Sequence, residues 1–550
     1  MFPKKELAQL VISACLQYNI DTVVISPGSR NAPLTIGFSN HLDIETLSVV
    51  DERCAAFFAM GIAQQKQKPV AIICSSGSAL LNYYPAIAEA FYSNIPLVVI
   101  SADRPKHLID IGDGQTIRQE NVFRNHILFS ANLIEAKNQL ENNTNLLVEA
   151  LEAAVFKKGP IHINVPFDEP LYETVKELNT FNFPDVIASK TKQSINYNKF
   201  VEIWNSSSKK MILVGSSFPY EALQNVLSKF TQDEAVLVLT ETTSNLYHSK
   251  FINAIDKLIF PLTEKSFLEL QPEVLLTLGG MVISKKIKQF LRKYQPKHHW
   301  HIDTLRSMDT YHCLSEFVQE IPVEFLQRLI SETVVVKSNY QANWLTKNKE
   351  RAEKHKKYLA NAEYSDLKSF EAVLNFIPDN SQLQISNSSI IRYSQLFDLN
   401  TTLRVFCNRG TSGIDGSTST AIGAAFAGKK QTTFITGDLS FFYDSNALWN
   451  TNIPNNFRII ILNNAGGGIF RFIPGPATTN ATNYFETPHS LTAEHLAKMY
   501  NFDYTAVSSL EELNIGLNDL YSESDQPKIM EIFTPKEIND VVLKSYFKNL

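Results

Sequence analysis

Two loops in the last third of the chain carry the oxygen-bearing groups that a hard metal cation prefers. The first loop follows the apolar run 432–436 and contains Asp438, and the second follows the apolar run 458–462 and contains Asn464 and Gly466. A helical segment separates the two runs, which predicts neighbouring parallel strands with both loops at the carboxyl-end edge of a sheet. Magnesium takes oxygen ligands from one or two carboxylates, together with phosphate oxygens and water. The pattern therefore predicts a metal-and-phosphate site with the ligands Asp438, Asn464 and Gly466.

Either loop alone is an ordinary turn sequence, because Gly-Asp and Asn-Asn-Ala-Gly-Gly punctuate strands in many proteins. The pair, separated by one strand–helix–strand unit, is more specific. It resembles the diphosphate-and-metal motif of thiamin diphosphate (ThDP) enzymes, which begins with Gly-Asp and ends with Asn-Asn. The resemblance implies ThDP and Mg²⁺ or Mn²⁺ as cofactors.

A glutamate in the first third of the chain is the candidate catalytic residue. Asp51, Glu52 and Arg53 follow a strand-like run and open a helical one, which is also the ordinary pattern of an N-cap and a first helical turn. On the residues alone, that structural interpretation is preferred. ThDP enzymes, however, place a glutamate after the second strand, where it bonds the aminopyrimidine ring and allows the cofactor to ionise. The resemblance therefore implies that Glu52 is catalytic.

Basic side chains recur in loops that follow strand-like runs. Each one alone is more simply explained as a surface charge or a structural ion pair. Together they predict a pocket for a substrate rich in carboxylates, because the planar guanidinium binds a carboxylate through two hydrogen bonds. The set is Arg30, Arg104, Arg118, Lys285, Lys286, Arg392 and Arg409.

The remainder of the chain predicts the framework that positions these residues. Strand-like and helical runs alternate in three stretches, 1–180, 195–340 and 360–550, and such alternation is typical of parallel sheets covered on both faces. The polar stretch 176–199 and the charged helical stretch 347–357 are the expected linkers. We therefore expect an α/β protein of three doubly wound parallel-sheet domains. The resemblance to ThDP enzymes implies pyrimidine-binding, central, and diphosphate- and metal-binding roles for them, in that order.

Composition narrows the class of protein. The chain is 44% hydrophobic and 19% charged, as globular proteins are, and a net charge of −5 argues against nucleic-acid binding. Five scattered cysteines without a Cys-x-x-Cys pair favour reduced thiols and a cytoplasmic location. No apolar run approaches the roughly 20 residues that a membrane span needs, and the N-terminus indicates an amphipathic helix, not a signal peptide.

Seven motifs together resemble one family of ThDP enzymes, the 2-succinyl-5-enolpyruvyl-6-hydroxy-3-cyclohexene-1-carboxylate (SEPHCHC) synthases of menaquinone biosynthesis. The motifs are residues 26–34, 51–53, 102–105, 117–119, 408–416, 437–440 and 463–467. The resemblance implies decarboxylation of 2-oxoglutarate and conjugate addition of the succinyl-semialdehyde carbanion to isochorismate. It also implies a homodimer or homotetramer with active sites at the dimer interface.

The same resemblance implies residue roles. Cofactor contacts would be Glu52, Ser388, Asn408, Ile414, Asp438, Leu439, Ser440, Asn464, Gly466, Gly467 and Ile469, with Ile414 as the apolar wedge that bends ThDP. Substrate contacts would be Ser29, Arg30, Arg104, Gln115, Lys285, Lys286, Ser388, Arg392, Arg409 and Phe470. Two features depart from the family pattern: Gly114 replaces an expected asparagine, and the middle stretch matches mainly through Lys285 and Lys286.

Other functions stay open at this point. One is another ThDP-dependent 2-oxoacid decarboxylase or carboligase, such as an enzyme like acetolactate synthase. A second is a non-catalytic ThDP-fold subunit, against which the presence of Glu52, Asp438 and Asn464 counts. A plain nucleotide-binding protein is less favoured, because the chain has neither a Gly-x-Gly-x-x-Gly run nor a P-loop.

Overall fold

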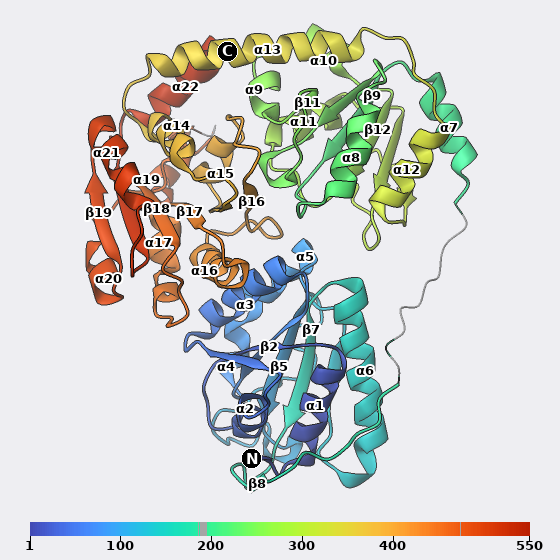
Figure 1. Ribbon diagram of the computed structural model, residues 1–550, viewed down its shortest axis with the longest axis vertical. Coiled ribbons are helices and arrows are strands. Elements are labelled where there is room, and N and C mark those ends of the chain that lie inside the picture. The colour runs from blue at the N-terminus through green and yellow to red at the C-terminus, as the bar shows by residue number, and fades with distance from the viewer. Residues whose placement is uncertain (185, 187–194, 473–474) are drawn as a thin grey trace.

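Three six-stranded parallel sheets, each flanked by helices, form the framework of the chain (Figure 1). The computed structural model describes residues 1–184, 186, 195–472 and 475–550. The predicted linker 176–199 therefore lies partly outside the described residues. The expectation of doubly wound parallel sheets is confirmed.

The first sheet has the strand order β3-β2-β4-β5-β7-β6. Its strands bury both faces: Val23 and Ile25 pack under α1, α2 and α6, whereas Val24 packs toward α3 and α5. This two-sided burial explains the continuous apolar runs of the sequence. A short antiparallel pair, β1 (Phe2–Pro3) with β8 (Thr174–Val175), lies apart from it. The elements of the sheet are β2 (Thr22–Ile25), β3 (Glu45–Ser48), β4 (Val70–Cys74), β5 (Leu97–Asp103), β6 (Ser130–Asn132), β7 (Ile161–Pro166), α1 (Glu6–Gln17), α2 (Ala32–Ser39), α3 (Glu52–Lys66), α4 (Ser78–Asn82), α5 (Tyr84–Ser93) and α6 (Leu140–Lys157).

The middle sheet has the order β11-β10-β9-β12-β13-β14. The chain adds β10 and β11 on one side of β9 and then β12, β13 and β14 on the other side, so the strand order switches between β9 and β12. Its elements are α7 (Tyr197–Ser206), β9 (Lys210–Val214), α8 (Glu221–Phe230), β10 (Val236–Leu239), β11 (Phe251–Ile252), α9 (Ile255–Ile259), α10 (Glu264–Leu270), β12 (Val274–Leu278), α11 (Lys285–Lys293), β13 (His298–Ile302), β14 (Glu316–Val318) and α12 (Pro322–Glu332).

The third sheet has the order β16-β15-β17-β18-β20-β19, and β17 and β18 pair in parallel from Thr432 to Gly437, as their sequences predict. The loops after these two strands therefore meet at one edge. The elements are α14 (Asp366–Phe376), β15 (Gln382–Ile385), α15 (Ser389–Ser394), β16 (Arg404–Phe406), α16 (Ser417–Gly428), β17 (Thr432–Gly437), α17 (Asp438–Tyr443), β18 (Phe457–Asn463), α18 (Ile469–Phe472), α19 (Ala481–Phe485), α20 (Glu494–Met499), β19 (Asp503–Val507), α21 (Leu510–Leu520), β20 (Lys528–Phe533) and α22 (Asn539–Asn549).

The charged stretch 347–357 is part of one long helix, α13 (Tyr340–Ala360), which runs along the top of the molecule in Figure 1. Tyr340 and Trp344 at its start are buried in a core of the middle unit, and Leu359 near its end is buried in the core of the third unit. The expected linker is therefore a rigid connection anchored at both ends.

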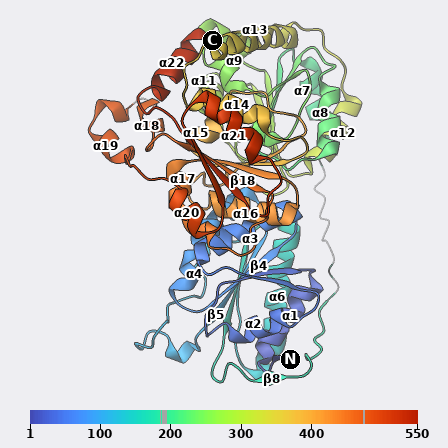
Figure 2. The same cartoon turned by 60° about the vertical axis from the view of Figure 1, so that its left-hand side comes forward.

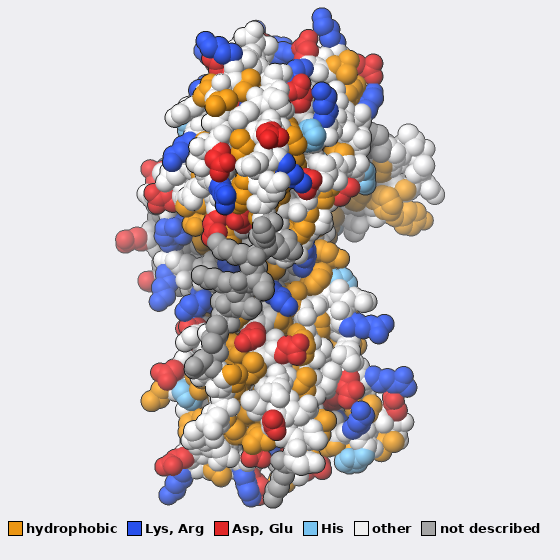
Figure 3. Space-filling model, turned by 90° about the vertical axis from the view of Figure 1, so that its right-hand side faces the viewer, with side chains coloured by type: hydrophobic (Ala, Val, Ile, Leu, Met, Phe, Trp, Pro, Cys, Tyr) orange, Lys and Arg blue, Asp and Glu red, His pale blue; other side chains and the backbone are white. Residues whose placement is uncertain are grey.

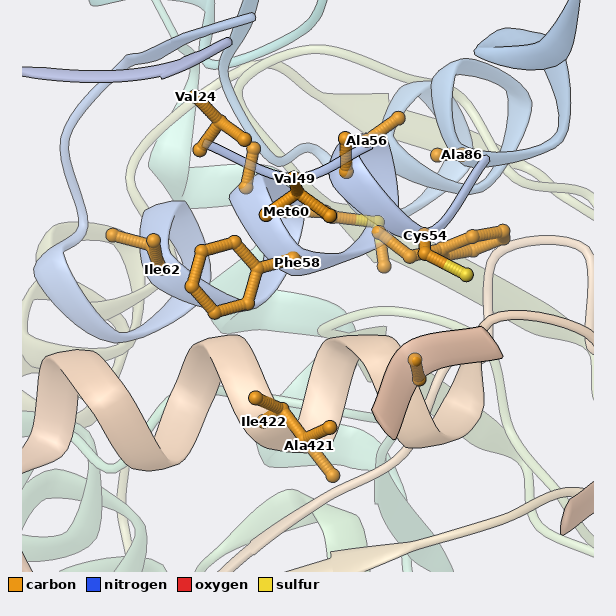
Figure 4. Close-up of a cluster of buried hydrophobic side chains, with 14 of the residues drawn as sticks. Val24, Val49, Cys54, Ala56, Phe58, Met60, Ile62, Ala86, Ala421 and Ile422 are labelled. Atoms are coloured by element: carbon orange, nitrogen blue, oxygen red, sulfur yellow. The ribbon is translucent and has the colours of Figure 1, made fainter. Parts of the chain in front are cut away.

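The first and third units meet through α3 and α16, which lie side by side in Figures 1 and 2. Their backbones approach closely: a Cβ on Gly61 would lie 2.1 Å from the Thr420 carbonyl oxygen, and one on Gly423 would lie 2.0 Å from that of Phe58. Figure 4 shows Phe58 of α3 facing Ala421 and Ile422 of α16 within one buried cluster. Small residues on both helices thus fix the first unit against the third.

The surface carries charges of both signs. On the face shown in Figure 3, Lys and Arg side chains are interspersed with Asp and Glu side chains. Among the helices that the structure describes, none combines the length and the hydropathy that crossing a bilayer requires.

Candidate active site

The Asp438 carboxylate joins the two predicted metal loops. Asp438 begins α17 directly after β17 and is only 3% exposed. Its Oδ2 accepts a hydrogen bond from the Gly466 backbone N–H at 2.9 Å, and its Oδ1 accepts one from the Leu439 N–H at 2.7 Å. The parallel pairing of β17 with β18 thus brings the predicted metal residues of both loops together.

The Asn464 side chain leaves an oxygen free at this edge. Its Nδ2 donates to Asp366 Oδ2 at 2.8 Å, whereas its Oδ1 is buried and has no hydrogen-bond partner among the described residues. An unpaired buried oxygen is costly unless something outside the chain satisfies it. A carboxylate, an amide oxygen and a backbone carbonyl form a donor set that suits Mg²⁺ or Mn²⁺. The residues present therefore fit the metal that the motif implies.

The backbone at Gly466 requires a glycine. Its φ is +142°, and a Cβ there would lie 2.5 Å from the Glu486 carbonyl oxygen. The described residues contain no cluster of three His, Cys, Asp or Glu side chains that could bind a metal.

Two residues at this site were missed by the sequence analysis. Asp366 orients the Asn464 amide, and His489 Nε2 lies 3.3 Å from Asp438 Oδ2. Burial raises the pKa of Asp438 to about 6, while the two backbone N–H donors oppose that shift. Neither Asp366 nor His489 lies near the motif in sequence, so no local pattern pointed to them.

Four predicted contacts line one cavity of about 460 Å³ between the middle and third units. They are Lys285 and Lys286 at the start of α11, Arg392 on α15, and Ile469 on α18. The cavity also reaches the metal loops, because Asp366 and Gly468 line it. Its apolar wall consists of Phe260, Leu396, Phe472, Leu543 and Phe547. A cavity with cationic groups and an apolar wall suits an anionic organic substrate.

The start of α11 is held by a third residue that the sequence analysis missed. Glu241 is 1% exposed and its carboxylate accepts hydrogen bonds from the backbone N–H groups of Ile283, at 2.6 Å, and Ser284, at 2.8 Å. Burial raises the pKa of Glu241 to about 7. These bonds fix the turn that presents Lys285 and Lys286.

The loop before α16 gathers further predicted residues. Arg409 Nη1 donates to Asn387 Oδ1 at 2.7 Å, and Asn387 Nδ2 donates to the carbonyl oxygens of Asn408 and Gly413, both at 2.7 Å. Ser440 Oγ donates to the Ile414 carbonyl oxygen at 2.7 Å. The predicted wedge Ile414 is thereby tied to the first metal loop.

Ser388 and three other predicted residues also lie at this edge. Ser388 has a φ of +69°, and its carbonyl oxygen accepts from Arg392 Nη1 at 2.6 Å. Leu439 bonds Asp438 through its backbone, and the Phe470 ring packs against Phe485 at 5.1 Å between centroids. A Cβ on Gly467 would lie 3.1 Å from the Phe470 ring, so this turn is compact.

The predicted residues of the first unit form a separate group at the edge of its own sheet. Arg30 Nη1 donates to the Phe167 carbonyl oxygen at 2.9 Å, and its Nη2 lies 3.2 Å from a carboxylate oxygen of Glu169. Arg104 Nη1 lies 3.8 Å from an oxygen of Asp113. In the part of the chain that the structure describes, the Nε atoms of both arginines are buried without a hydrogen-bond partner, which leaves donors for a ligand.

Positions 114, 115 and 118 differ in their surroundings. The Gln115 backbone packs against Gly77, whereas a Cβ on Gly114 would meet nothing within 4 Å. The asparagine expected at position 114 would therefore fit, and its absence removes a side-chain donor. Arg118 pairs with Asp110 at 2.8 Å and its side chain is 83% exposed, so its assignment to the carboxylate pocket is not supported.

Glu52 lies in the first turn of α3, and the Asp51 side chain caps that helix by accepting from the Cys54 N–H at 3.1 Å. Burial raises the pKa of Glu52. Its two neighbours reach the third unit of the same chain: Asn446 Nδ2 donates to Asp51 at 2.9 Å, and Arg53 Nη2 donates to the Tyr443 carbonyl oxygen at 2.9 Å. Glu52 itself is left half-buried between them.

A single chain holds the candidate site as two halves. Within residues 1–184, 186, 195–472 and 475–550, no hydrogen bond or ion pair joins Ser29, Arg30, Glu52, Arg104 or Gln115 to the metal loops. The structure therefore brings together the metal loops, the Lys285–Arg392 cavity and the Arg409 loop, whereas in the described part of the chain the group of the first unit is not bonded to the metal loops.

Comparisons with known proteins give matches along the chain. Residues 5–127 match the family model described as the thiamine pyrophosphate enzyme N-terminal TPP binding domain, and residues 184–385 match the middle domain of thiamine pyrophosphate enzymes. A protein of Flavobacterium johnsoniae is 55% identical over 100% of both chains, and one of Flavobacterium psychrophilum is 54% identical, also over 100% of both. One of Bacteroides thetaiotaomicron is 36% identical over 100% of this chain and 99% of its own. All three are named 2-succinyl-5-enolpyruvyl-6-hydroxy-3-cyclohexene-1-carboxylate synthase.

Proposed function

The chain belongs to the SEPHCHC synthase family of ThDP enzymes, and we propose that it decarboxylates 2-oxoglutarate and adds the resulting four-carbon unit to isochorismate in menaquinone biosynthesis. The observation that carries the proposal is that the metal-fitting loops adjoin the cavity that is lined by basic side chains. Asp366 bonds Asn464 in the metal-fitting loops and also lines the cavity that holds Lys285, Lys286 and Arg392. A metal–diphosphate anchor thus adjoins a cationic substrate pocket.

The cofactor would be held at the third sheet. Asp438, the Asn464 amide oxygen and the Gly466 carbonyl would bind Mg²⁺ or Mn²⁺ and, through it, the diphosphate. Leu439, Ser440, Gly467 and Ile469 lie in or directly after the same loops and would contact the cofactor together with Asn408, Ser388 and Ile414. Ser440 donates a hydrogen bond to the Ile414 carbonyl oxygen, and Asn408 donates one to the Thr420 hydroxyl. When bound, ThDP supplies the nucleophilic carbon and the electron sink that decarboxylation of a 2-oxoacid requires.

Glu52 would hold a proton at a ring nitrogen of the aminopyrimidine. Burial raises its pKa, so the carboxyl group binds a proton more readily than an exposed glutamate does. A general acid–base residue is most effective when its pKa approaches the working pH. The chemistry asked of Glu52 therefore agrees with its half-buried position at the start of α3.

The basic residues would orient the two substrates, each of which carries two carboxylates. Lys285, Lys286, Arg392 and Arg409 act from the middle and third units, and Ser29, Arg30, Arg104 and Gln115 act from the first. The Nε atoms of Arg30, Arg104 and Arg409 are buried and have no hydrogen-bond partner within the described ranges, so each has an N–H for a carboxylate. Phe470 and the apolar wall of the cavity would exclude water.

We also propose a homodimer or homotetramer in which each active site combines two chains. The support is that, among the described residues, no hydrogen bond or ion pair joins Glu52 to the metal loops of its own chain. The units would be the domains 1–180, 195–340 and 360–550. The five cysteines are unpaired, which supports action in the cytoplasm.

A turnover assay tests the proposed function. The chain is incubated with ThDP, Mg²⁺, isochorismate and either 2-oxoglutarate or pyruvate, and the adduct is identified by mass spectrometry. We expect SEPHCHC to form when 2-oxoglutarate is the 2-oxoacid supplied and not when pyruvate is. We expect its formation to be lost when the metal is chelated. Turnover of pyruvate in preference to 2-oxoglutarate would instead indicate an enzyme like acetolactate synthase. Binding of ThDP without turnover of either substrate would indicate a non-catalytic subunit.

A further inference from the structure

A buried carboxylate of the first unit binds the loop that carries Arg409. Glu89, on α5, is only 1% exposed. Its Oε1 accepts a hydrogen bond from the Gly410 N–H at 2.6 Å, and its Oε2 accepts from the Thr411 N–H at 2.6 Å. The Thr411 hydroxyl donates to the same Oε2 at 2.8 Å, and the Ser412 N–H lies 3.4 Å from it. Three successive backbone N–H groups of the third unit therefore point at one side chain of the first.

The backbone of the loop is shaped for this contact. A Cβ on Gly410 would lie 2.4 Å from the Glu89 carbonyl oxygen and 2.9 Å from its Oε1. Only glycine allows the loop to approach α5 so closely. The close approach and the hydrogen bonds thus occur at the same residue.

The opposite side of the loop is held by the third unit itself. Asn387 accepts from Arg409 Nη1 and donates to the carbonyl oxygens of Asn408 and Gly413. The loop is consequently fixed between an asparagine of its own unit and a glutamate of the first unit. Arg409 lies immediately before the residues that Glu89 binds.

The charge of Glu89 is satisfied by these donors. In the part of the chain that the structure describes, no Lys, Arg or His forms an ion pair with Glu89, and Ser93 Oγ completes its partners at 2.8 Å. Hydrogen bonds to an ionised acceptor are stronger than neutral ones, and a buried charge that loses its donors is destabilised further. A neutral side chain at position 89 would therefore release the loop.

We propose that Glu89 is a positioning residue for the reaction. It holds residues 408–414 of its own chain so that Arg409 faces the substrate pocket and Ile414 stands where the cofactor would bend. The role of Arg409 rests on the proposed function, whereas the clamp itself does not. Glu89 touches neither substrate nor cofactor, and it acts through the backbone of the loop.

Hydrogen exchange tests the clamp without any need for activity. We compare the full-length wild type with E89Q and with S93A by mass spectrometry of peptides that contain residues 408–414. In E89Q the amides of Gly410, Thr411 and Ser412 should exchange at least about tenfold faster, since each loses a charged acceptor. The S93A variant, which removes only the bond from the neighbouring residue of the same helix, should keep wild-type exchange. Unchanged exchange in E89Q would overturn the proposal.

Kinetics test what the clamp does. We expect E89Q to raise the KM for 2-oxoglutarate by about tenfold, and E89Q/R409A to be no worse than R409A, because both changes act through one side chain. Fully additive effects would contradict the proposal.

If the wild type does not turn over 2-oxoglutarate, the proposed function fails while the exchange measurement still decides the clamp. If E89Q does not fold, E89D, which keeps the charge on a shorter side chain, takes its place in both tests with the same expected directions.

Discussion

Asn464 shows how one side chain can be oriented for a ligand. Its amide nitrogen is engaged by Asp366, so its oxygen is the end that remains free beside the metal loops. The buried Asp438 carboxylate is braced by two backbone N–H groups in the same way. Such supporting bonds set the direction of metal ligands and contribute to affinity.

The first prediction concerns Asp438. Asp438→Asn should weaken the binding of ThDP and of Mg²⁺ together by at least about tenfold, because the diphosphate is held largely through the ion and a neutral amide is a poorer ligand. Calorimetric titration of each, with the other in excess, measures the effect. Equal affinities in wild type and variant would reduce Asp438 to a turn residue.

The second prediction concerns Glu52. Glu52→Gln keeps the size of the side chain but cannot exchange a proton, so activity should fall by about 10²–10⁴ while cofactor binding is preserved. The step is isolated by NMR of deuterium exchange at the thiazolium carbon of bound ThDP. Exchange as fast as in wild type would return Glu52 to its ordinary role at a helix start.

The site could be predicted from sequence where the residues follow strands in a recognisable motif. Asp438, Asn464 and Gly466 are such residues, and the parallel pairing of β17 and β18 makes them neighbours. Asp366, Glu89 and Glu241 could not be found in this way. Each acts on a segment far away in the chain, so only the packing of whole units brings it to the site.

At the scale of elements, the contact between α3 and α16 connects the two catalytic units. Gly61 and Gly423 allow the helices to approach, and α3 begins at Glu52 while α16 follows the Arg409–Ile414 loop. The sequence analysis predicts the helix that follows Asp51 but not its contact with α16, because small residues on a helix are equally compatible with solvent. The packing of α3 against α16 therefore fixes both the Arg409–Ile414 loop and Glu52.

The third prediction is a pH dependence of this contact. Asp444 is fully buried beside Arg53, and it accepts hydrogen bonds from the Ser419 N–H and hydroxyl. Burial raises the pKa of Asp444 from its usual 3.8 to about 6. A raised folded-state pKa means that the folded state binds the proton more tightly. The stability contributed by this group is therefore full below pH 3.8 and is lost as the pH rises through about 6.

The measurement compares urea midpoints of wild type and Asp444→Asn at about pH 4.5 and pH 7. The decline in unfolding free energy toward pH 7 should be smaller in the variant by on the order of 2 kcal/mol, because the group no longer titrates. The exposed aspartate variant Asp525→Asn serves as the matched control and should keep the wild-type decline. An unchanged decline in Asp444→Asn would contradict the assignment.

At the scale of the whole molecule, alternation of strands and helices was sufficient to predict three parallel sheets. It could not predict how the sheets are placed, because that depends on side-chain packing between units. The helix α13 illustrates the limit: its charged stretch indicates a linker, yet Trp344 and Leu359 anchor it in two different cores. Among the described residues no hydrogen bond or ion pair joins Glu52 to the metal loops of its own chain, which is the basis for proposing a shared site.

The most direct test of the account mixes two inactive chains. Glu52→Ala and Asp438→Ala chains are dissociated, combined and reassembled, and SEPHCHC formation is measured beside wild type treated identically. Random re-pairing makes about half of the dimers mixed, and each mixed dimer has one complete site out of two, so about a quarter of the wild-type activity should return. No recovery, with wild type regaining its activity after the same treatment, would show that both halves of the site belong to one chain.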